Sequence, residues 1–210
     1  MSAIATAAAG SPPVAHALPA DEYFGSASLG KIGMWIFLLS DAFSFGGLLL
    51  AYGILRGGSE VWHHPGEPSL GIPFTAFLTF LLICSSVTMV LAVAAATEGH
   101  RRETMIFLGL TALGGIGFLT GQFHEYFGLV PNHGLVHEGL VFGHSAYAST
   151  FYVITSFHGA HVFTGTMYIL VTLARTAAGK TNANDIEVLG LFWHFVDLIW
   201  ILVFTFVYLL

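Results

Sequence analysis

Three carboxylates lie inside long apolar stretches of this 210-residue chain, where an ionised group is costly. Asp41 lies in the stretch MWIFLLSDAFSF, Glu125 in GQFHEY and Asp197 in FWHFVDLIW. A carboxylate at the centre of a membrane costs about 2.5–3.5 kcal/mol on insertion scales, so such residues serve as proton carriers or as polar contacts between helices. These three positions are therefore the first candidates for function.

Asp41 has two interpretations that the sequence leaves open. On a helix, its neighbours one turn away include Phe37, Leu38, Ser44 and Phe45, which are mostly apolar. The side chain is either a proton-relay group or a neutral acid that hydrogen-bonds to another helix.

The other two carboxylates have neighbouring histidines. His194 and Asp197 are three residues apart and share a helix face, which predicts a buried hydrogen bond between them. Glu125 is expected to act as a polar contact between helices or as a helix cap. His158 and His161 have the same spacing and could hold a metal, but a third ligand would have to come from another helix.

Histidines also suggest two arrangements for binding haem. His144 and His158 are 14 residues apart, a spacing that suits two stacked haems, but no second helix carries a matching pair. A single haem between His124 and His144 is the other arrangement. A loop also carries candidate ligands for zinc or copper: His133, His137 and Glu138. We expect no metal or cofactor in this chain, and no catalytic residue.

The composition excludes an ordinary soluble domain, because 55% of the residues are hydrophobic and only 9% are charged. Soluble domains carry roughly a quarter charged residues. With six Lys and Arg in total, the chain has no basic patch for nucleic acid. Its single cysteine, Cys84, cannot form an intrachain disulfide.

Five apolar segments are each long enough to cross a membrane as a helix of about 20 residues. They lack the alternation of a barrel strand, so the fold class is an all-α integral membrane bundle. The segments are about 29–55, 72–96, 104–127, 145–176 and 187–210. In the third, Gly117 and Gly121 form a G-x-x-x-G pattern that lets another helix approach closely.

Basic residues predict the orientation of the bundle, since they are more frequent on the inner side of a membrane. With the N-terminus inside, only Arg56 falls outside. The other five basic residues fall inside: Lys31, Arg101, Arg102, Arg175 and Lys180. Residues 1–28 lack a basic region and a compact apolar core, so we expect a mobile or surface-lying arm and no cleaved signal. Residues 29–210 form the predicted transmembrane domain.

Four blocks of sequence resemble subunit III of haem–copper terminal oxidases. The range Ser149–Val162 reads STFYVITSFHGAHV and resembles the family pattern S-T-F-[FY]-x-x-T-[GS]-F-H-G-x-H-V. The range Phe192–Trp200 resembles [YF]-W-H-F-V-D-x-x-W. The range Phe37–Phe45 resembles F-x-x-S-E-x-x-F-F, and Gln122–Tyr126 fits Q-x-x-E-Y. The resemblance covers all five segments.

The resemblance implies a subunit without redox centres, in a proton-pumping oxidase of aerobic respiration. Haem and copper then belong to partner subunits, while this subunit packs on subunit I, holds phospholipid and supports proton uptake and durable turnover. The chain resembles the five-helix form of the family, and Asp41 stands where the family has a glutamate. We expect a cytochrome c oxidase in a bacterial cytoplasmic membrane, with a quinol oxidase, a nitric oxide reductase or a metal-binding membrane enzyme as alternatives. We expect a structural or proton-related role for six buried polar residues: Asp41, Glu125, His158, His161, His194 and Asp197.

Overall fold

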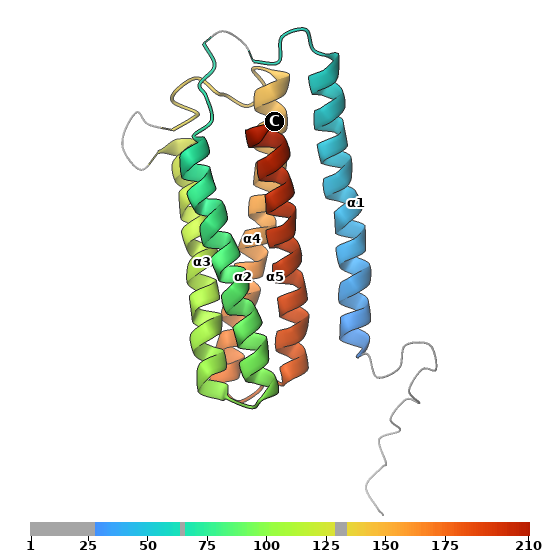
Figure 1. Ribbon diagram of the computed structural model, residues 1–210, viewed down its shortest axis with the longest axis vertical. Coiled ribbons are helices and arrows are strands. Elements are labelled where there is room, and N and C mark those ends of the chain that lie inside the picture. Colours follow the sequence, from blue (N-terminus) through green and yellow to red (C-terminus); the bar gives the residue numbers. More distant parts are fainter. Residues whose placement is uncertain (1–27, 64–65, 129–133) are drawn as a thin grey trace, which may run out of the picture.

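Within the part of the chain that the structure describes, the fold consists of five long helices and a short π-helical end, which confirms the all-α class and the number of helices (Figure 1). The computed structural model describes residues 28–63, 66–128 and 134–210. The helices are α1 (Leu29–Gly58), α2 (Ile72–Thr97), α3 (Arg101–Phe127), α4 (Ala146–Ala177) and α5 (Ala183–Val203). The π-helix η1 (Phe204–Leu209) continues α5. The predicted N-terminal arm lies outside the described residues, apart from Ser28.

Local sequence explains where these helices begin. The side chains of Ser28, Ser145 and Asn182 accept hydrogen bonds from the backbone N–H groups of the first turns of α1, α4 and α5. In α5, Asp185 completes a capping box with Asn182. The α5 helix therefore begins at Ala183, four residues before the predicted start of its segment, because the sequence pattern followed only the apolar residues.

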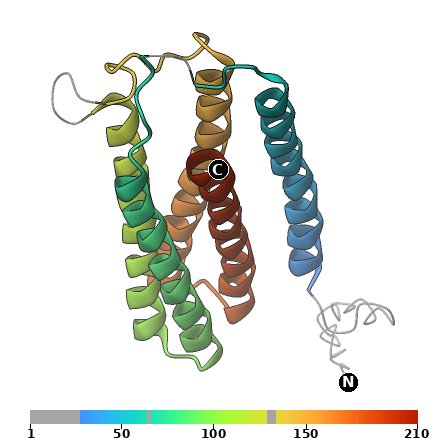
Figure 2. The same cartoon turned by 45° about the horizontal axis from the view of Figure 1, so that its top comes forward.

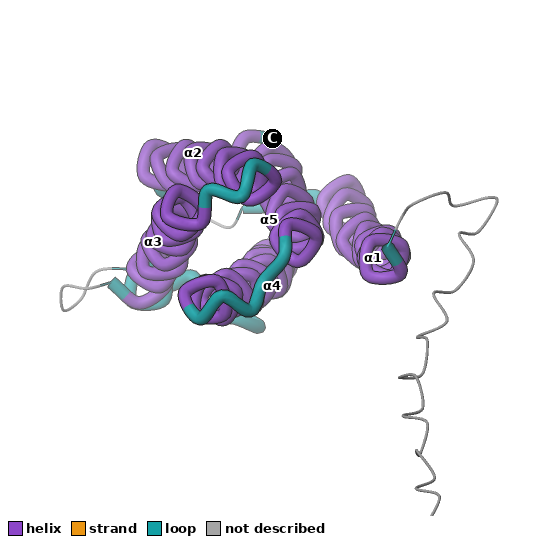
Figure 3. The backbone as a smooth tube through the Cα atoms, turned by 90° about the horizontal axis from the view of Figure 1, so that it is seen from below, coloured by secondary structure: helices purple, strands orange, loops and turns teal. Residues whose placement is uncertain are grey.

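The helices α2 to α5 form a four-helix ring, and α1 stands beside it (Figures 2 and 3). Helix α1 packs against α5 and α4, whereas α3 packs against α2 and α4. The core of the ring contains large side chains that are almost fully buried: Phe118, Phe151, Trp193 and Trp200. The indole N–H of Trp200 donates to Oγ1 of Thr79 at 2.9 Å, so even this aromatic core is tied to α2 by a polar contact.

Glycines on α3 allow the close approach that the G-x-x-x-G pattern predicted. A Cβ atom added at Gly121 would lie 2.4 Å from Cδ2 of Leu78, and one at Gly117 would lie 2.9 Å from Cδ2 of Leu81. Both neighbours belong to α2, so this prediction is confirmed. The opposite side of α3 carries Gly115, where an added Cβ atom would likewise lie too close to side chains of α4 and α5.

Four of the helices are long and apolar enough to cross a membrane by length and composition: α1, α2, α3 and α5 with η1. Within the described part of the chain, α4 does not meet that criterion, although it is the longest helix, with 32 residues. The reason is its polar inner face, which buries Thr155, His158, Thr166, Thr172 and Thr176. Protein neighbours, rather than lipid, surround these groups.

Candidate functional site

Asp41 and His161 form a polar contact between α1 and α4, near the middle of both helices. Oδ1 of Asp41 lies 3.3 Å from Nε2 of His161, and both residues are largely buried. The second oxygen of Asp41, Oδ2, is buried without a hydrogen-bond partner among the described residues. A hydrogen bond to another helix was one of the two interpretations of Asp41, and His161 on α4 is the residue that its carboxyl group contacts.

The geometry of this pair allows the two side chains to share a proton. Nδ1 of His161 lies 2.8 Å from the carbonyl oxygen of Phe157, and a carbonyl only accepts, so Nδ1 carries a hydrogen. Nε2 can then accept from a protonated Asp41 or, if it is also protonated, donate to the carboxylate. In both of these states, the Asp41–His161 pair shares one exchangeable proton.

His158 lies one turn from His161 but in different surroundings. Its side chain is fully buried, and neither ring nitrogen has a hydrogen-bond partner among the described residues. The ring lies between aromatic neighbours, 4.8 Å from Trp200 and 5.6 Å from Phe118 between ring centroids. The i,i+3 spacing thus does not bring His158 and His161 to a common third ligand. Their separate surroundings favour packing over metal binding.

Ser86 on α2 contacts two of the candidate residues on α5, a role that the sequence did not predict. Its Oγ lies 2.6 Å from Nδ1 of His194, and it also interacts with the carboxyl group of Asp197. The predicted direct hydrogen bond between His194 and Asp197 is therefore wrong. The two residues do share a helix face, but a hydroxyl from the neighbouring helix interacts with both of them.

Glu125 connects three parts of the bundle, as its expected role between helices required. Its Oε1 accepts from Oγ1 of Thr75 on α2 at 2.9 Å, and its Oε2 accepts from the hydroxyl of Tyr208 in η1 at 3.0 Å. The carboxyl group is buried. The π-helical end of the chain was not predicted, and it carries Tyr208 to this contact.

A second network lies one turn away on α3. Nε2 of Gln122 donates to the carbonyl oxygen of Thr155 at 2.7 Å and to the hydroxyl of Tyr126 at 3.1 Å. The Tyr126 hydroxyl lies 2.5 Å from Oγ1 of Thr155. A Cβ atom at Gly159 would lie 2.5 Å from Oε1 of Gln122, so a glycine is required opposite this amide.

The remaining candidate ligands are not brought together. His144 precedes Ser145, the N-cap of α4, so it does not share a helix with His158 as the stacked-haem arrangement required. The ring of His124 packs at 5.5 Å from Phe74, while His137 and Glu138 are exposed. His133 lies outside the described residues. Across residues 28–63, 66–128 and 134–210, no three His, Cys, Asp or Glu side chains are grouped to hold a metal ion.

Comparison with known proteins agrees with this arrangement. The family model described as "Cytochrome c oxidase subunit III" matches residues 25–210, which include all five helices. A "Cytochrome c oxidase subunit 3" of Thermostichus vulcanus is 37% identical over 184 residues, covering 85% of this chain and 86% of the relative. A protein of the same name from Synechocystis sp. is 35% identical over 192 residues, covering 90% and 78%.

A relative named as a subunit of a quinol oxidase has a similar level of identity. The "Cytochrome bo(3) ubiquinol oxidase subunit 3" of Pseudomonas aeruginosa is 34% identical over 185 residues, covering 85% of this chain and 83% of the relative. The similarity therefore extends to subunits of oxidases with different electron donors.

Proposed function

The chain belongs to the cytochrome c oxidase subunit III family, and we propose that it is the non-redox subunit III of a proton-pumping cytochrome c oxidase. The observation that carries this proposal is the family match over residues 25–210, which spans every helix. As a subunit III, the chain is an integral membrane component of a haem–copper terminal oxidase complex. The proposal also covers the electron donor of the oxidase, the supporting role of this subunit, its bound lipid and its orientation in the membrane.

The supporting role follows from how the buried polar groups are used. Glu125 is held by Thr75 and Tyr208, and His194 contacts Ser86. Such contacts join helices to one another, as expected of a subunit that packs on subunit I while haem and copper reside in partner subunits. We assign a proton-related role to Asp41, because its contact with His161 holds an exchangeable proton.

The orientation and the fifth crossing are supported by charge and length. The five inner basic residues of the prediction lie at or beyond the ends of helices at one end of the bundle, and Arg56 lies at the other (Figure 1). Helix α4 has 32 residues and is about 48 Å long, which exceeds the roughly 30 Å hydrocarbon core. It also runs alongside the other helices. We therefore place five crossings in a bacterial cytoplasmic membrane, with the N-terminus inside.

A lipid-binding role is supported by an apolar groove between α1 and α5. The groove has a volume of about 350 Å³ and is lined by residues that include Trp35, Leu38, Leu191 and Leu198. Its walls are almost entirely apolar, which suits an acyl chain of a phospholipid.

The experiment that tests the supporting role compares the oxidase with and without this chain in proteoliposomes. We expect the oxidase that lacks the chain to begin at a rate within about twofold of the complete enzyme, since the redox centres remain. It should then lose activity after several-fold fewer turnovers.

An Asp41→Asn variant should assemble normally, because an amide can still bond to His161. It should lose activity faster than the unaltered enzyme, because the exchangeable proton is absent.

Glu138→Gln serves as the matched control, since it makes the same change at an exposed carboxylate. Equal durability of the complete enzyme and of the enzyme without the chain would contradict the supporting role. If the Asp41→Asn enzyme is as durable as the unaltered enzyme, Asp41 has no part in the supporting role.

A quinol oxidase is the second candidate, favoured by the 34% identity to the Pseudomonas aeruginosa subunit. A copper-binding subunit that co-purifies with this chain would indicate a cytochrome c oxidase. A partner subunit without copper would indicate a quinol oxidase.

A further inference from the structure

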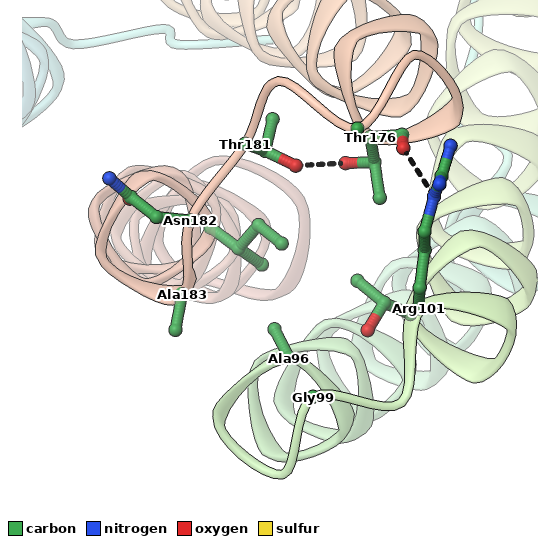
Figure 4. A pocket seen from close by; sticks show the side chains of 10 residues that line it. Ala96, Gly99, Arg101, Thr176, Thr181, Asn182 and Ala183 are labelled. Atoms are coloured by element: carbon green, nitrogen blue, oxygen red, sulfur yellow. Dashed lines mark hydrogen bonds between the residues drawn. The ribbon is translucent and has the colours of Figure 1, made fainter.

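We propose that a hollow at the basic end of the bundle binds a phosphate group at the inner surface of the membrane. This inner-turn hollow lies between the turn joining α2 to α3 and the connection joining α4 to α5 (Figure 4). Its lining includes Ala96, Gly99, Arg101, Thr181 and Ala183, and its volume is about 240 Å³. The proposal extends the lipid-binding part of the proposed function and rests on the proposed orientation.

Arg101 supplies the positive charge of the hollow. Its Nε donates to the carbonyl oxygen of Thr176 at 2.8 Å, and its Nη2 donates to that of Ala177. Both acceptors are neutral, so among the described residues no carboxylate is paired with this guanidinium. A guanidinium has five N–H donors, and those beyond these two bonds remain for a ligand.

The side chains of the other described lining residues carry no negative charge. They are small, hydroxyl-bearing, amide or aliphatic residues, and none of them is an Asp or Glu. The nearby carboxylates have partners elsewhere: Asp185 lies 3.6 Å from Arg175, and Glu98 and Glu103 lie within 4 Å of His100. An anion is therefore the ligand that this hollow favours, and phosphate oxygens suit the planar donors of an arginine.

The walls of the hollow are built before any ligand binds. Gly99 and Gly179 adopt left-handed conformations, with φ of +78° and +71°, and they allow the two tight turns that bound it. Oγ1 of Thr181 donates to Oγ1 of Thr176 at 3.0 Å and ties the second turn to the end of α4 (Figure 4). A ligand therefore meets a largely preformed site.

The depth of the hollow places it at the headgroups of the bilayer. Helices α2 and α3 have 26 and 27 residues and are about 40 Å long, so their ends extend past a hydrocarbon core of roughly 30 Å. Basic pockets between transmembrane helices on the cytoplasmic side bind anionic lipid headgroups. The phosphate can come from such a headgroup or from inorganic phosphate in the cytoplasm.

Three variants of the full chain test this site. Arg101→Gln removes the charge, and Ala96→Leu fills the hollow while leaving the bonds of Arg101 to α4 intact. Arg102→Gln is the matched control, because it removes the neighbouring charge, which does not line the hollow. Two probes separate the sources: retention of phosphatidylglycerol over phosphatidylethanolamine by native mass spectrometry, and the thermal shift caused by inorganic phosphate at constant ionic strength.

We expect the unaltered chain to retain phosphatidylglycerol or to be stabilised by inorganic phosphate, and the responding probe identifies the source. Arg101→Gln and Ala96→Leu should weaken that binding about tenfold to a hundredfold, while Arg102→Gln leaves it unchanged. The proposal is overturned if neither probe responds, if Ala96→Leu binds as the unaltered chain does, or if Arg102→Gln weakens binding equally. Co-purifying subunits are identified in the same preparation, so a chain that binds phosphate but lacks oxidase partners would refute the proposed function alone.

Discussion

Gly115→Leu is expected to prevent the bundle from closing and to lower the yield of folded chain severely. Even a Cβ atom at this position would lie 2.4 Å from Oγ1 of Thr166 and 2.8 Å from Cη2 of Trp193. Both neighbours are buried, and Trp193 is bonded through its indole N–H to Ser85, so neither side chain can move aside. Overpacking a core costs about 1–3 kcal/mol or more, and a leucine here obstructs three helices at once.

The control for this change lies on the same helix. Gly109 has no atom within 4 Å of an added Cβ, so Gly109→Ala should fold as the unaltered chain does. The measurement is the amount of monodisperse chain extracted from membranes, together with its midpoint of thermal unfolding in detergent. A Gly115→Leu chain that unfolds at the unaltered midpoint would show that α3, α4 and α5 do not pack as described.

Glu125→Ala is expected to lower the free energy of unfolding by about 2–4 kcal/mol. The change leaves the buried hydroxyl of Tyr208 without its acceptor and opens a cavity beside it. Thr75 suffers less, because its hydroxyl also donates to the carbonyl oxygen of Gly71 at 3.1 Å. Most of the loss should therefore come from the contact with Tyr208.

A double-mutant cycle measures this contact with a matched control. Tyr208→Phe removes the donor, so the double variant with Glu125→Ala should lose less stability than the sum of the two single changes. Glu138→Ala removes an exposed carboxylate and should change unfolding by less than about 0.5 kcal/mol. Strict additivity in the cycle would mean that Glu125 and Tyr208 do not interact.

The lengths of the apolar segments were sufficient to predict five helices. A segment in lipid must form its backbone hydrogen bonds within itself, and a helix does so. The ends of the helices were less predictable. An apolar segment ends with the hydrocarbon core of the membrane, whereas the helix that contains it continues into the headgroup region. Arg101, for example, precedes the predicted segment 104–127 but begins α3. The π-helix η1 was not predicted from the sequence, although it carries Tyr208 to its contact with Glu125.

Residues of the site could be predicted where the sequence of a single helix was enough to identify them. The partners in contacts between two helices could not be predicted in this way. Contacts between helices, one of the two roles expected of Asp41 and of Glu125, followed from the cost of burying a carboxylate. Their partners did not, because spacing along one helix says nothing of the neighbouring helix. The same limit explains why Asp197 was paired with His194, while Ser86 on α2 was overlooked.

The central claim is that this chain supports the redox chemistry of an oxidase without holding a redox centre. The most direct test is the haem and copper content of the purified chain, measured by absorbance and by elemental analysis, alone and with its co-purifying subunits. The claim predicts haem and copper in the complex and none in stoichiometric amount in the chain alone. About one haem or metal ion per isolated chain, lost in His158→Ala or His161→Ala, would contradict it.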